Sequence, residues 1–397
     1  MSKKEIYNIE LPTEGTQRSS RNAGSHRDNS TGSNRNNSRN GKKMTRSQMR
    51  RRKRKRMLII EVIVLILVLI FLFIWLKLGK ISWDDLKNLR VNNMDNETEE
   101  LLDGYTNIAL FGIDNRSSGN YDSGNSDSTM VCSINNETKE VKLLSVYRDT
   151  CMDVDGDGTF RKCNYAYNHG GPEQAIEMLN RNLDLNIQKY VSVDFNALAE
   201  AVDALGGIDL DITSEEAYFM NGSQGYIAET ARHIGGNAAN VSVGPQRVNG
   251  VQAVAYCRIR ATAGGDFSRA ERQRKVLQSM VAELDGASIG EMNDMVNAVF
   301  DDIGTNFKLN QIIAMAAYVK DYKLVETHGF PYNMKTGSYG QQGSLVVPCT
   351  LESNVRQLHT DLFGNEEMEV SKEVSRISDE IQNFTGYGED SAVDYGY

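Results

Sequence analysis

The sequence predicts a layered α-β-α domain with a central mixed sheet, preceded by a single transmembrane helix and a disordered basic tail. Three observations predict this arrangement. Short apolar segments typical of strands alternate with segments of helical apolar spacing, which is the pattern of layered α/β domains. A run of about 20 apolar residues precedes them, long enough to cross a hydrocarbon core. A strongly basic segment with few apolar residues precedes that run.

The basic tail comprises residues 1–56. It contains 17 Lys and Arg against 4 Asp and Glu, whereas the remainder of the chain contains 27 against 49. Because the tail has almost no apolar side chains to bury, we expect it to be disordered. Its last stretch, RRRKRKR, resembles a nucleic-acid-binding arm. Beside a membrane span, however, membrane topology and attraction to anionic lipid are simpler roles, so no specific nucleic-acid partner is expected.

Residues 57–76, MLIIEVIVLILVLIFLFIWL, predict a transmembrane helix interrupted only by Glu61. Basic residues beside a span stay on the cytoplasmic side, so the tail should be inside the cell and the chain after Lys77 outside. A cleaved signal peptide would need a short basic region and a cleavage site of small residues. Here the apolar run ends in KLGKISWDD, so we expect an uncleaved, single-pass signal-anchor in the cell membrane.

The chain beyond the anchor divides into three parts. Residues 77–104 are expected to be a linker, and residues 105–365 contain the predicted strands and helices of an extracellular domain. Residues 366–397 are acidic and contain Gly and Tyr, so we expect a flexible C-terminal tail.

The first half of the domain alternates between strands and helices. Three strands are expected to open it, namely NIALFGI, TMVCSI and VKLLSVY. Pro172 is at a typical first helical position and begins the helix EQAIEMLNRNL, and YVSVDF predicts the next strand. ALAEAVDAL predicts a helix closed by Gly206 and Gly207, and the strand IDLDI follows.

The second half is predicted to be mainly helical. GVQAVAYCRIR begins as a helix, and SRAERQRKVLQSMVAEL is a strong helix because Ser268 and Glu271 form a capping box. Amphipathic helices are expected around EMNDMVNAVF and NQIIAMAAYV. The strand SLVVPC and the helix ESNVRQLHTDLF complete the domain.

Two cysteines flank a predicted hairpin, CMDVDGDGTFRKC. Cys151 and Cys163 lie symmetrically about Asp157, so the hairpin would bring them opposite each other. A disulfide is compatible with an extracellular domain, and the sequence leaves open whether it forms. DVDGDG also resembles the start of a calcium loop, but Asn164 stands where that loop requires a bidentate Glu, which favours a hairpin turn.

Arginine is the most informative residue type for function, since no GxSxG, HExxH, P-loop or paired CxxC motif occurs. Residues two apart in an extended segment face the same way, so Arg258 and Arg260 in YCRIR could hold one ligand. Guanidinium groups suit phosphate oxygens, and Arg148, Arg269, Arg272 and the helix N-terminus at Ser268 could complete a phosphate or pyrophosphate site. Ordinary surface ion pairs are the alternative interpretation.

Four carboxylates are candidates for holding Mg²⁺, namely Asp114, Asp127, Asp149 and Asp266. Asp114 ends a predicted strand, and Asp127 lies across the polar loop NRSSGNYDSGNS, which is typical of loops that close over ligands. Mg²⁺ is commonly bound through a few carboxylates together with substrate phosphates. Turn formation is the alternative role for each aspartate.

Several segments taken together resemble the LytR-CpsA-Psr family. They are, in order, LFGIDNR, NSDST, SVYRDT, NYAYNHGGPEQAIEMLN, VDFNALAEAVDALGGIDLDI, YCRIR and DFSRAERQRKVL, and the match spans roughly Tyr105 to Leu284. The resemblance implies a phosphotransferase of cell wall biogenesis. Such an enzyme takes a glycopolymer from a polyprenyl-pyrophosphate carrier and attaches it to peptidoglycan, typically at the 6-hydroxyl of muramic acid. The polymers of the family are teichoic acids, capsules and similar wall glycans.

The resemblance also implies residue roles. Asp114 and Asp127 would bind Mg²⁺, and Arg148 and Asp127 would be catalytic. The pyrophosphate would be bound by Arg116, Arg148, Arg258, Arg260, Arg269, Gln273 and Asp266. The last three match the family's D-x-x-R-x-x-x-Q pattern, and positions 269 and 273 share one helical face. Asp149 is expected to orient Arg148.

Three departures from the family pattern occur. Asn125 stands where the family usually has Arg, so one pyrophosphate contact is expected to be missing or supplied by Arg116. Tyr147 replaces the usual Pro before the critical Arg, and INNETK lacks the Pro of the strand-ending turn. The last two departures affect turn rigidity rather than chemistry.

The implied reaction is an in-line attack by a sugar hydroxyl on the phosphorus nearer the glycan, with polyprenyl phosphate expelled. An apolar channel between helices and sheet should hold the lipid chain.

Two other functions stay open: a membrane-anchored regulator, and a protein that only binds or hydrolyses polyprenyl pyrophosphate.

Overall fold

The computed structural model describes residues 82–83, 86, 89–114, 124–286, 303–308, 311, 315 and 318–396. The basic tail, the predicted transmembrane helix, Arg116, the predicted helix around EMNDMVNAVF and most of the next predicted helix lie outside the described residues. Within the described ranges, no helix is both long enough and apolar enough to span a bilayer.

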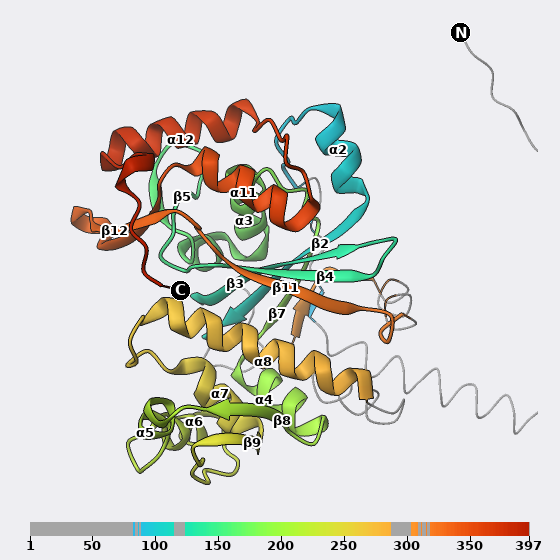
Figure 1. Ribbon diagram of the computed structural model, residues 1–397, viewed down its shortest axis with the longest axis vertical. Coiled ribbons are helices and arrows are strands. Elements are labelled where there is room, and N and C mark those ends of the chain that lie inside the picture. Colours follow the sequence, from blue (N-terminus) through green and yellow to red (C-terminus); the bar gives the residue numbers. More distant parts are fainter. Residues whose placement is uncertain are drawn as a thin grey trace, which may run out of the picture. The chain divides into compact units, whose positions relative to one another are not determined.

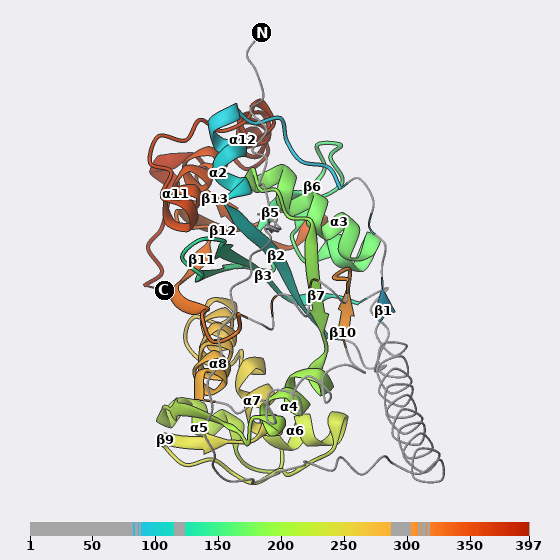
Figure 2. The ribbon, with the colours of Figure 1, turned by 90° about the vertical axis from the view of Figure 1, so that its right-hand side faces the viewer.

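A seven-stranded mixed sheet forms the centre of the described structure (Figures 1 and 2). In spatial order its strands are β1 (Ser82–Trp83), β10 (Ile303–Thr305), β7 (Lys189–Val193), β2 (Tyr105–Ile113), β3 (Ser126–Asn135), β4 (Glu140–Val146) and β11 (Lys323–Phe330). Strands β2, β3 and β4 pair antiparallel, while β7 runs parallel to β2 and β11 parallel to β4. The predicted central mixed sheet is confirmed.

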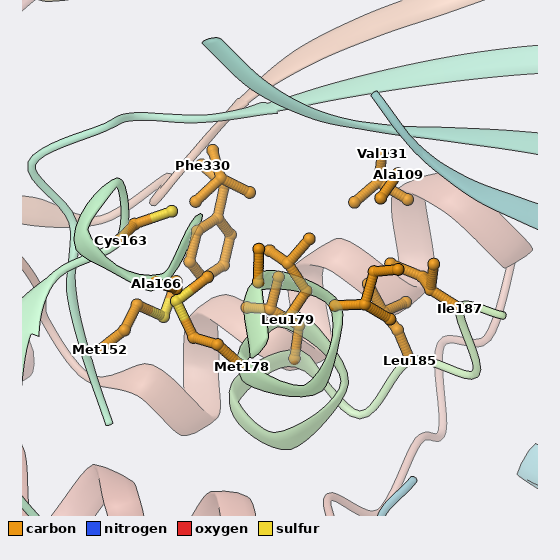
Figure 3. Close-up of a cluster of buried hydrophobic side chains, with 14 of the residues drawn as sticks. Ala109, Val131, Met152, Cys163, Ala166, Met178, Leu179, Leu185, Ile187 and Phe330 are labelled. Atoms are coloured by element: carbon orange, nitrogen blue, oxygen red, sulfur yellow. The ribbon is translucent and has the colours of Figure 1, made fainter. Parts of the chain in front are cut away.

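One face of the sheet is covered by a solid apolar layer. Its helices are α2 (Asn96–Asp103), α3 (Tyr165–Leu183), α11 (Leu351–Phe363) and α12 (Lys372–Thr385), with two small hairpins, β5 (Cys151–Asp153) with β6 (Phe160–Lys162) and β12 (Met334–Ser338) with β13 (Ser344–Pro348). Figure 3 shows Leu179 of α3 on the side of the sheet that carries Ala109 and Val131. All three side chains are fully buried.

The opposite face carries a second group of elements (Figure 2). They are α4 (Phe195–Ala204), α5 (Ser214–Met220), α6 (Tyr226–Ile234), α7 (Gly250–Arg258), α8 (Asp266–Gly286) and the separate hairpin of β8 (Ile208–Ile212) with β9 (Gly244–Val248). These elements have an apolar cluster of their own, centred on α7. Two short 3-10 helices, η1 (Gly340–Gln342) and η2 (Glu389–Ser391), complete the described elements.

Two expectations about the ends of the domain are wrong. The linker predicted at residues 77–104 contains α2, which Asp95 caps and whose Leu102 is fully buried. The tail predicted to be flexible, residues 366–397, contains α12, whose Val374, Ile377 and Ile381 are buried. The acidic composition of this segment suggested flexibility, but its apolar residues recur at helical spacing. Their burial against the rest of the domain keeps the segment helical.

The hairpin CMDVDGDGTFRKC forms as predicted, but its cysteines do not pair. In the β5–β6 register Cys151 lies opposite Lys162, one residue from the symmetric arrangement. Adjacent residues of a strand point to opposite faces, so this shift separates the two sulfur atoms. Both cysteines are free and buried, and burial raises the pKa of each thiol to about 12.

Two helix starts were predicted with different success. Helix α3 is interrupted at Gly170 and Gly171 and resumes at Pro172, which confirms the predicted start there. Helix α8 begins at Asp266 rather than at Ser268, so the predicted capping box does not form. The Ser268 hydroxyl instead donates at 2.7 Å to the carbonyl of Ala263, which precedes the helix.

Candidate active site

A cavity of about 580 Å³ lies between the sheet and the helices α4, α6, α7 and α8. Its apolar lining includes Leu110, Met130, Val191, Leu198, Val276 and Leu277. The predicted site residues that line it are Asp114, Asp127, Arg258, Arg260, Arg269 and Gln273. The cavity therefore combines an apolar wall with a group of charged side chains.

Asp127 is the carboxylate on which three of the predicted arginines converge. It lies near the start of β3, and its Oδ1 accepts from Nη1 of Arg148 at 2.9 Å. Its Oδ2 accepts a short hydrogen bond from Nη2 of Arg260 and lies 3.6 Å from Nη1 of Arg269. Residues more than 130 positions apart thus meet at one carboxylate, which spacing along the chain could not reveal.

Asp266 is the second carboxylate of the cluster. It begins α8, and its Oδ2 accepts from Nε of Arg148 at 3.0 Å and forms an ion pair with Nη2 of the same side chain at 3.0 Å. Its Oδ1 lies 3.3 Å from Nη1 of Arg269. Burial alone would lower the pKa of Arg148, but Asp266 and Asp127 outweigh burial and raise it, so Arg148 is a permanent cation.

Arg269 is almost fully buried, with 4% of its side chain exposed. Its Nη2 donates to the Asp127 carbonyl at 3.2 Å, whereas Nε and Nη1 have no hydrogen-bond acceptor among the described residues. Burial lowers the pKa of Arg269 to about 10, against the opposing effect of Asp266 and Asp127. A buried guanidinium with unused donors at a cavity wall favours an anionic ligand there.

Arg258 and Arg260 reach the same cavity but have different partners. Arg258 is the last residue of α7, and its guanidinium donates to Glu229 at 2.8 Å and to Thr230 at 2.9 Å. It also lies over the Phe195 ring, 5.2 Å from the centroid. Arg258 and Arg260 both line the cavity, but Arg258 is helical rather than part of the extended segment expected from the sequence, and it lies apart from the Asp127 cluster.

Asp114 and Asp127 both line the cavity, and both could offer oxygen ligands to Mg²⁺. Asp114 is exposed, and its carboxylate has no ion pair with another described residue. Its backbone N–H donates to the Asn125 carbonyl at 3.2 Å, which holds the ends of β2 and β3 together. Within the described ranges no group of three His, Cys, Asp or Glu side chains could hold a metal, so the two aspartates would need further oxygens from a ligand.

Asp149 lies outside the cavity lining, beside Arg148. Its Oδ1 is 3.8 Å from Arg148 Nε and 3.1 Å from Lys162 Nζ. This geometry agrees with an orienting role for Asp149 and adds Lys162, which sequence reasoning missed. Glu229 was also missed. No motif marked either residue, because both depend on contacts between separate elements.

The arrangement can bind an amphiphilic anion. Three guanidinium groups and two carboxylates form a preorganised cluster. Asp127, Arg260 and Arg269 of this cluster line the cavity, Arg148 and Asp266 lie next to them outside the lining, and apolar side chains line much of the rest. An incoming phosphate could replace carboxylate oxygens as partner of the same arginine donors.

The chain resembles known proteins in sequence and in fold. The model of the LytR_cpsA_psr family matches residues 75–355. The polyisoprenyl-teichoic acid–peptidoglycan teichoic acid transferase TagV of Bacillus subtilis (strain 168) is 29% identical over 238 residues, which cover 59% of this chain and 58% of TagV. A transferase of the same description, TagU of Enterococcus faecalis, is 30% identical over 53% of this chain and 64% of TagU. The chain thus spans only 58% and 64% of the length of these two relatives.

Solved structures show the same fold. Protein gbs0355 from Streptococcus agalactiae superposes with a TM-score of 0.58 at 24% identity, covering 70% of this chain and 92% of that chain. The crystal structure of B. subtilis TagV superposes with a TM-score of 0.52 at 22% identity, covering 67% and 98%.

Proposed function

The chain belongs to the LytR-CpsA-Psr family, and we propose that it transfers a glycopolymer from a polyprenyl-pyrophosphate carrier to a sugar hydroxyl of peptidoglycan. The observation that carries this proposal is the joining of an arginine cluster to an apolar cavity. A lipid pyrophosphate has the matching shape, because a strongly anionic headgroup is attached to a hydrocarbon chain. The names of TagV and TagU, transferases of teichoic acid to peptidoglycan, agree with the proposal.

In the proposed mechanism, the arginine cluster binds the pyrophosphate. Arg148 and Arg260 would exchange part of their contacts with Asp127 and Asp266 for phosphate oxygens, and the unused donors of Arg269 would add to them. These donors are already oriented in the described structure, so little side-chain entropy would be lost on binding. Arg258, held by Glu229 in the cavity lining, would bind the pyrophosphate from another side.

The transfer itself would be an in-line displacement. The acceptor hydroxyl oxygen forms a bond to the phosphorus nearer the glycan, the bond from that phosphorus to the bridging oxygen breaks, and polyprenyl phosphate leaves. The hydroxyl proton passes to a carboxylate of the cluster. Asp114 and Asp127 would hold Mg²⁺, which supplies positive charge to the phosphate oxygens when bound.

The apolar part of the cavity would hold the first units of the lipid chain. Leu110, Met130, Leu198 and Leu277 would contact the hydrocarbon and exclude water from the pyrophosphate. The signal-anchor expected at residues 57–76 would hold this domain at the outer surface of the cell membrane, where such a carrier resides.

The test is a reconstituted reaction with the purified full-length chain, a lipid-linked glycan, Mg²⁺ and peptidoglycan fragments, read by mass spectrometry. A covalent glycan–peptidoglycan product that disappears with EDTA is the expected result. Glycan phosphate released without attachment would instead indicate a pyrophosphatase, and unchanged substrate would indicate binding alone. Arg247→Ala is a control for the arginine variants, because Arg247 pairs with Glu283 at the surface, away from the cavity lining.

A further inference from the structure

The C-terminal segment, residues 372–396, follows the part of the chain that the family model matches, which ends at residue 355. After α12 the chain descends beside β12 to a C-terminus that lies near the start of α8 (Figure 1). One end of this segment contacts the β5–β6 hairpin, and the other end contacts the start of α8. Both of these elements lie next to Arg148. These two contacts are the basis of the inference.

The first contact joins α12 to the β5–β6 hairpin. Arg376 of α12 donates to the fully buried carboxylate of Asp153 at 3.1 Å. The ring of Phe384, at the end of α12, stacks on the ring of Phe160 with centroids 5.7 Å apart. The hairpin is therefore fixed to α12 at both of its strands.

This hairpin in turn fixes the backbone and the neighbour of Arg148. Two residues after β6, the Asn164 N–H donates to the Arg148 carbonyl at 3.0 Å. Lys162 of β6 pairs with Asp149 at 3.1 Å. Movement of the hairpin would therefore shift both Arg148 and the carboxylate beside it.

The second contact is an aromatic stack at the other side of Arg148. The Tyr395 ring lies 5.5 Å from the ring of Phe267, which lies 4.7 Å from the ring of Tyr147 in an edge-on arrangement. Tyr147 immediately precedes Arg148, and Phe267 immediately follows Asp266. The stack therefore joins the backbones of two residues whose side chains form an ion pair.

The end of the segment is held in place by polar contacts to β12. The Tyr395 hydroxyl accepts from the Thr336 N–H at 2.9 Å and lies 3.0 Å from the Thr336 hydroxyl. The Val393 N–H donates to the Met334 carbonyl at 2.9 Å. Tyr395 thus has a defined position rather than a chance contact.

We propose that residues 372–396 are a strap that positions Arg148 against Asp266, and that Tyr395 is a positioning residue of the anion site. The strap holds the hairpin after Arg148 and the helix start that carries Asp266, so the ion pair between them is fixed before any ligand arrives. The identity of that ligand as a lipid pyrophosphate rests on the proposed function, whereas the positioning does not. Preorganised donors bind an anion with a smaller loss of side-chain entropy.

The test measures how fast phenylglyoxal modifies individual arginines in the purified full-length chain, read by mass spectrometry. Tyr395→Ala should speed modification of Arg148 roughly threefold to tenfold, the range expected when one aromatic contact is lost. Tyr395→Phe keeps the ring and should stay within about twofold of the native rate. Tyr218→Ala is the matched control, since Tyr218 is a 77% exposed tyrosine on α5.

Arg272 is the internal reference, because it is buried on the same helix as Asp266 and pairs with Glu216 at 2.8 Å. Modification of Arg148 should rise while that of Arg272 does not. An unchanged Arg148 rate, or an equal rise at Arg272 that signals general loosening, would overturn the proposal. Phe267→Leu, which removes the middle ring of the stack, must reproduce the effect of Tyr395→Ala.

Inorganic pyrophosphate provides a second measurement. It should protect Arg148 from phenylglyoxal in the native chain, and Tyr395→Ala should need a roughly threefold to tenfold higher concentration for the same protection. Both measurements use no glycan, lipid or peptidoglycan, so a failed transfer reaction would leave them unaffected. Conversely, a working transferase with an unaltered Arg148 in Tyr395→Ala would refute the strap alone.

Discussion

The two faces of the central sheet are built from the same strands but have opposite properties. On the face of α3, Ala109, Val131 and Leu179 belong to one apolar cluster and are fully buried (Figure 3). On the face of α8, Leu110 and Met130 line a cavity of about 580 Å³ instead. Neighbouring residues of one strand therefore belong to a packed core and to a cavity wall.

The difference shows how one sheet supports both stability and a binding site. Successive side chains of a strand point to opposite faces of the sheet, so β2 and β3 contribute residues both to the packed core and to the cavity wall. Helix α8 is held to the rest of the second face by the buried Arg272–Glu216 pair, whereas its Arg269 turns to the cavity. The packed face is expected to determine folding stability, and the open face ligand binding.

The largest expected effect concerns the open face. Arg148→Ala should lower the rate of glycan transfer about a hundredfold to a thousandfold. Removing one preorganised donor that stabilises the charge developing in a transition state typically has an effect of this size. The fold should persist, since Arg260 and Arg269 still neutralise Asp127. The rate of product formation by mass spectrometry checks this. A comparable loss in the surface variant Arg247→Ala would contradict the assignment.

A matched pair of leucines tests the comparison directly. Leu179→Ala should lower the free energy of unfolding by about 2–5 kcal/mol, because it opens a void in a filled core. Leu277→Ala should cost only about 1 kcal/mol, since Leu277 is half-buried and already faces a cavity. Urea unfolding of the purified chain measures both. Equal losses would show that the two faces contribute alike to stability.

The packed face should also control the pH dependence of stability. His359 of α11 is fully buried, its Nε2 lies 3.0 Å from the Leu183 carbonyl, and burial lowers its pKa to about 4. Between this pKa and the ordinary value of 6.5 the unfolded chain binds more protons. Stability should therefore fall as the pH drops through this window, by about 3 kcal/mol in total.

His359→Gln provides the comparison for the pH effect. Glutamine can donate to the Leu183 carbonyl but does not titrate, so the stability of the variant should depend less on pH between about 6.5 and about 4. Other titrating groups are the same in both chains and cancel in the difference. Parallel pH profiles of the two chains would exclude His359 as the cause.

The smallest expected effect is a gain at the open face. Asn125 is exposed at the start of β3, and its carbonyl accepts from the N–H of Asp114. Asn125→Arg should increase the affinity for inorganic pyrophosphate about twofold to fivefold, the size of an exposed charge interaction. Calorimetric titration measures it. Asn237→Arg, in an exposed loop, is the control that adds the same charge elsewhere, and an equal gain there would mean a general charge effect.

Local patterns predicted the elements whose signals are local. The strands of the first half, the helix start at Pro172 and the helix closed by Gly206 and Gly207 follow from apolar spacing and from backbone preferences of Pro and Gly. Predictions were wrong where the structure of a segment depends on residues far away in the sequence. Helix α12 is stable because it packs against the core, and Cys151 and Cys163 stay apart because the hairpin register shifts by one residue.

The sequence by itself determined the residue types of the site and the family to which the chain belongs. It could not determine that Arg148, Arg260 and Arg269 share Asp127, that Arg258 pairs with Glu229, or that Tyr395 reaches the start of α8. Apolar spacing and turn signals act over a few residues, whereas these contacts join positions far apart in the chain. Only the packing of the helices and the C-terminal segment around the sheet decides them, because burial and charge pairing depend on which elements meet.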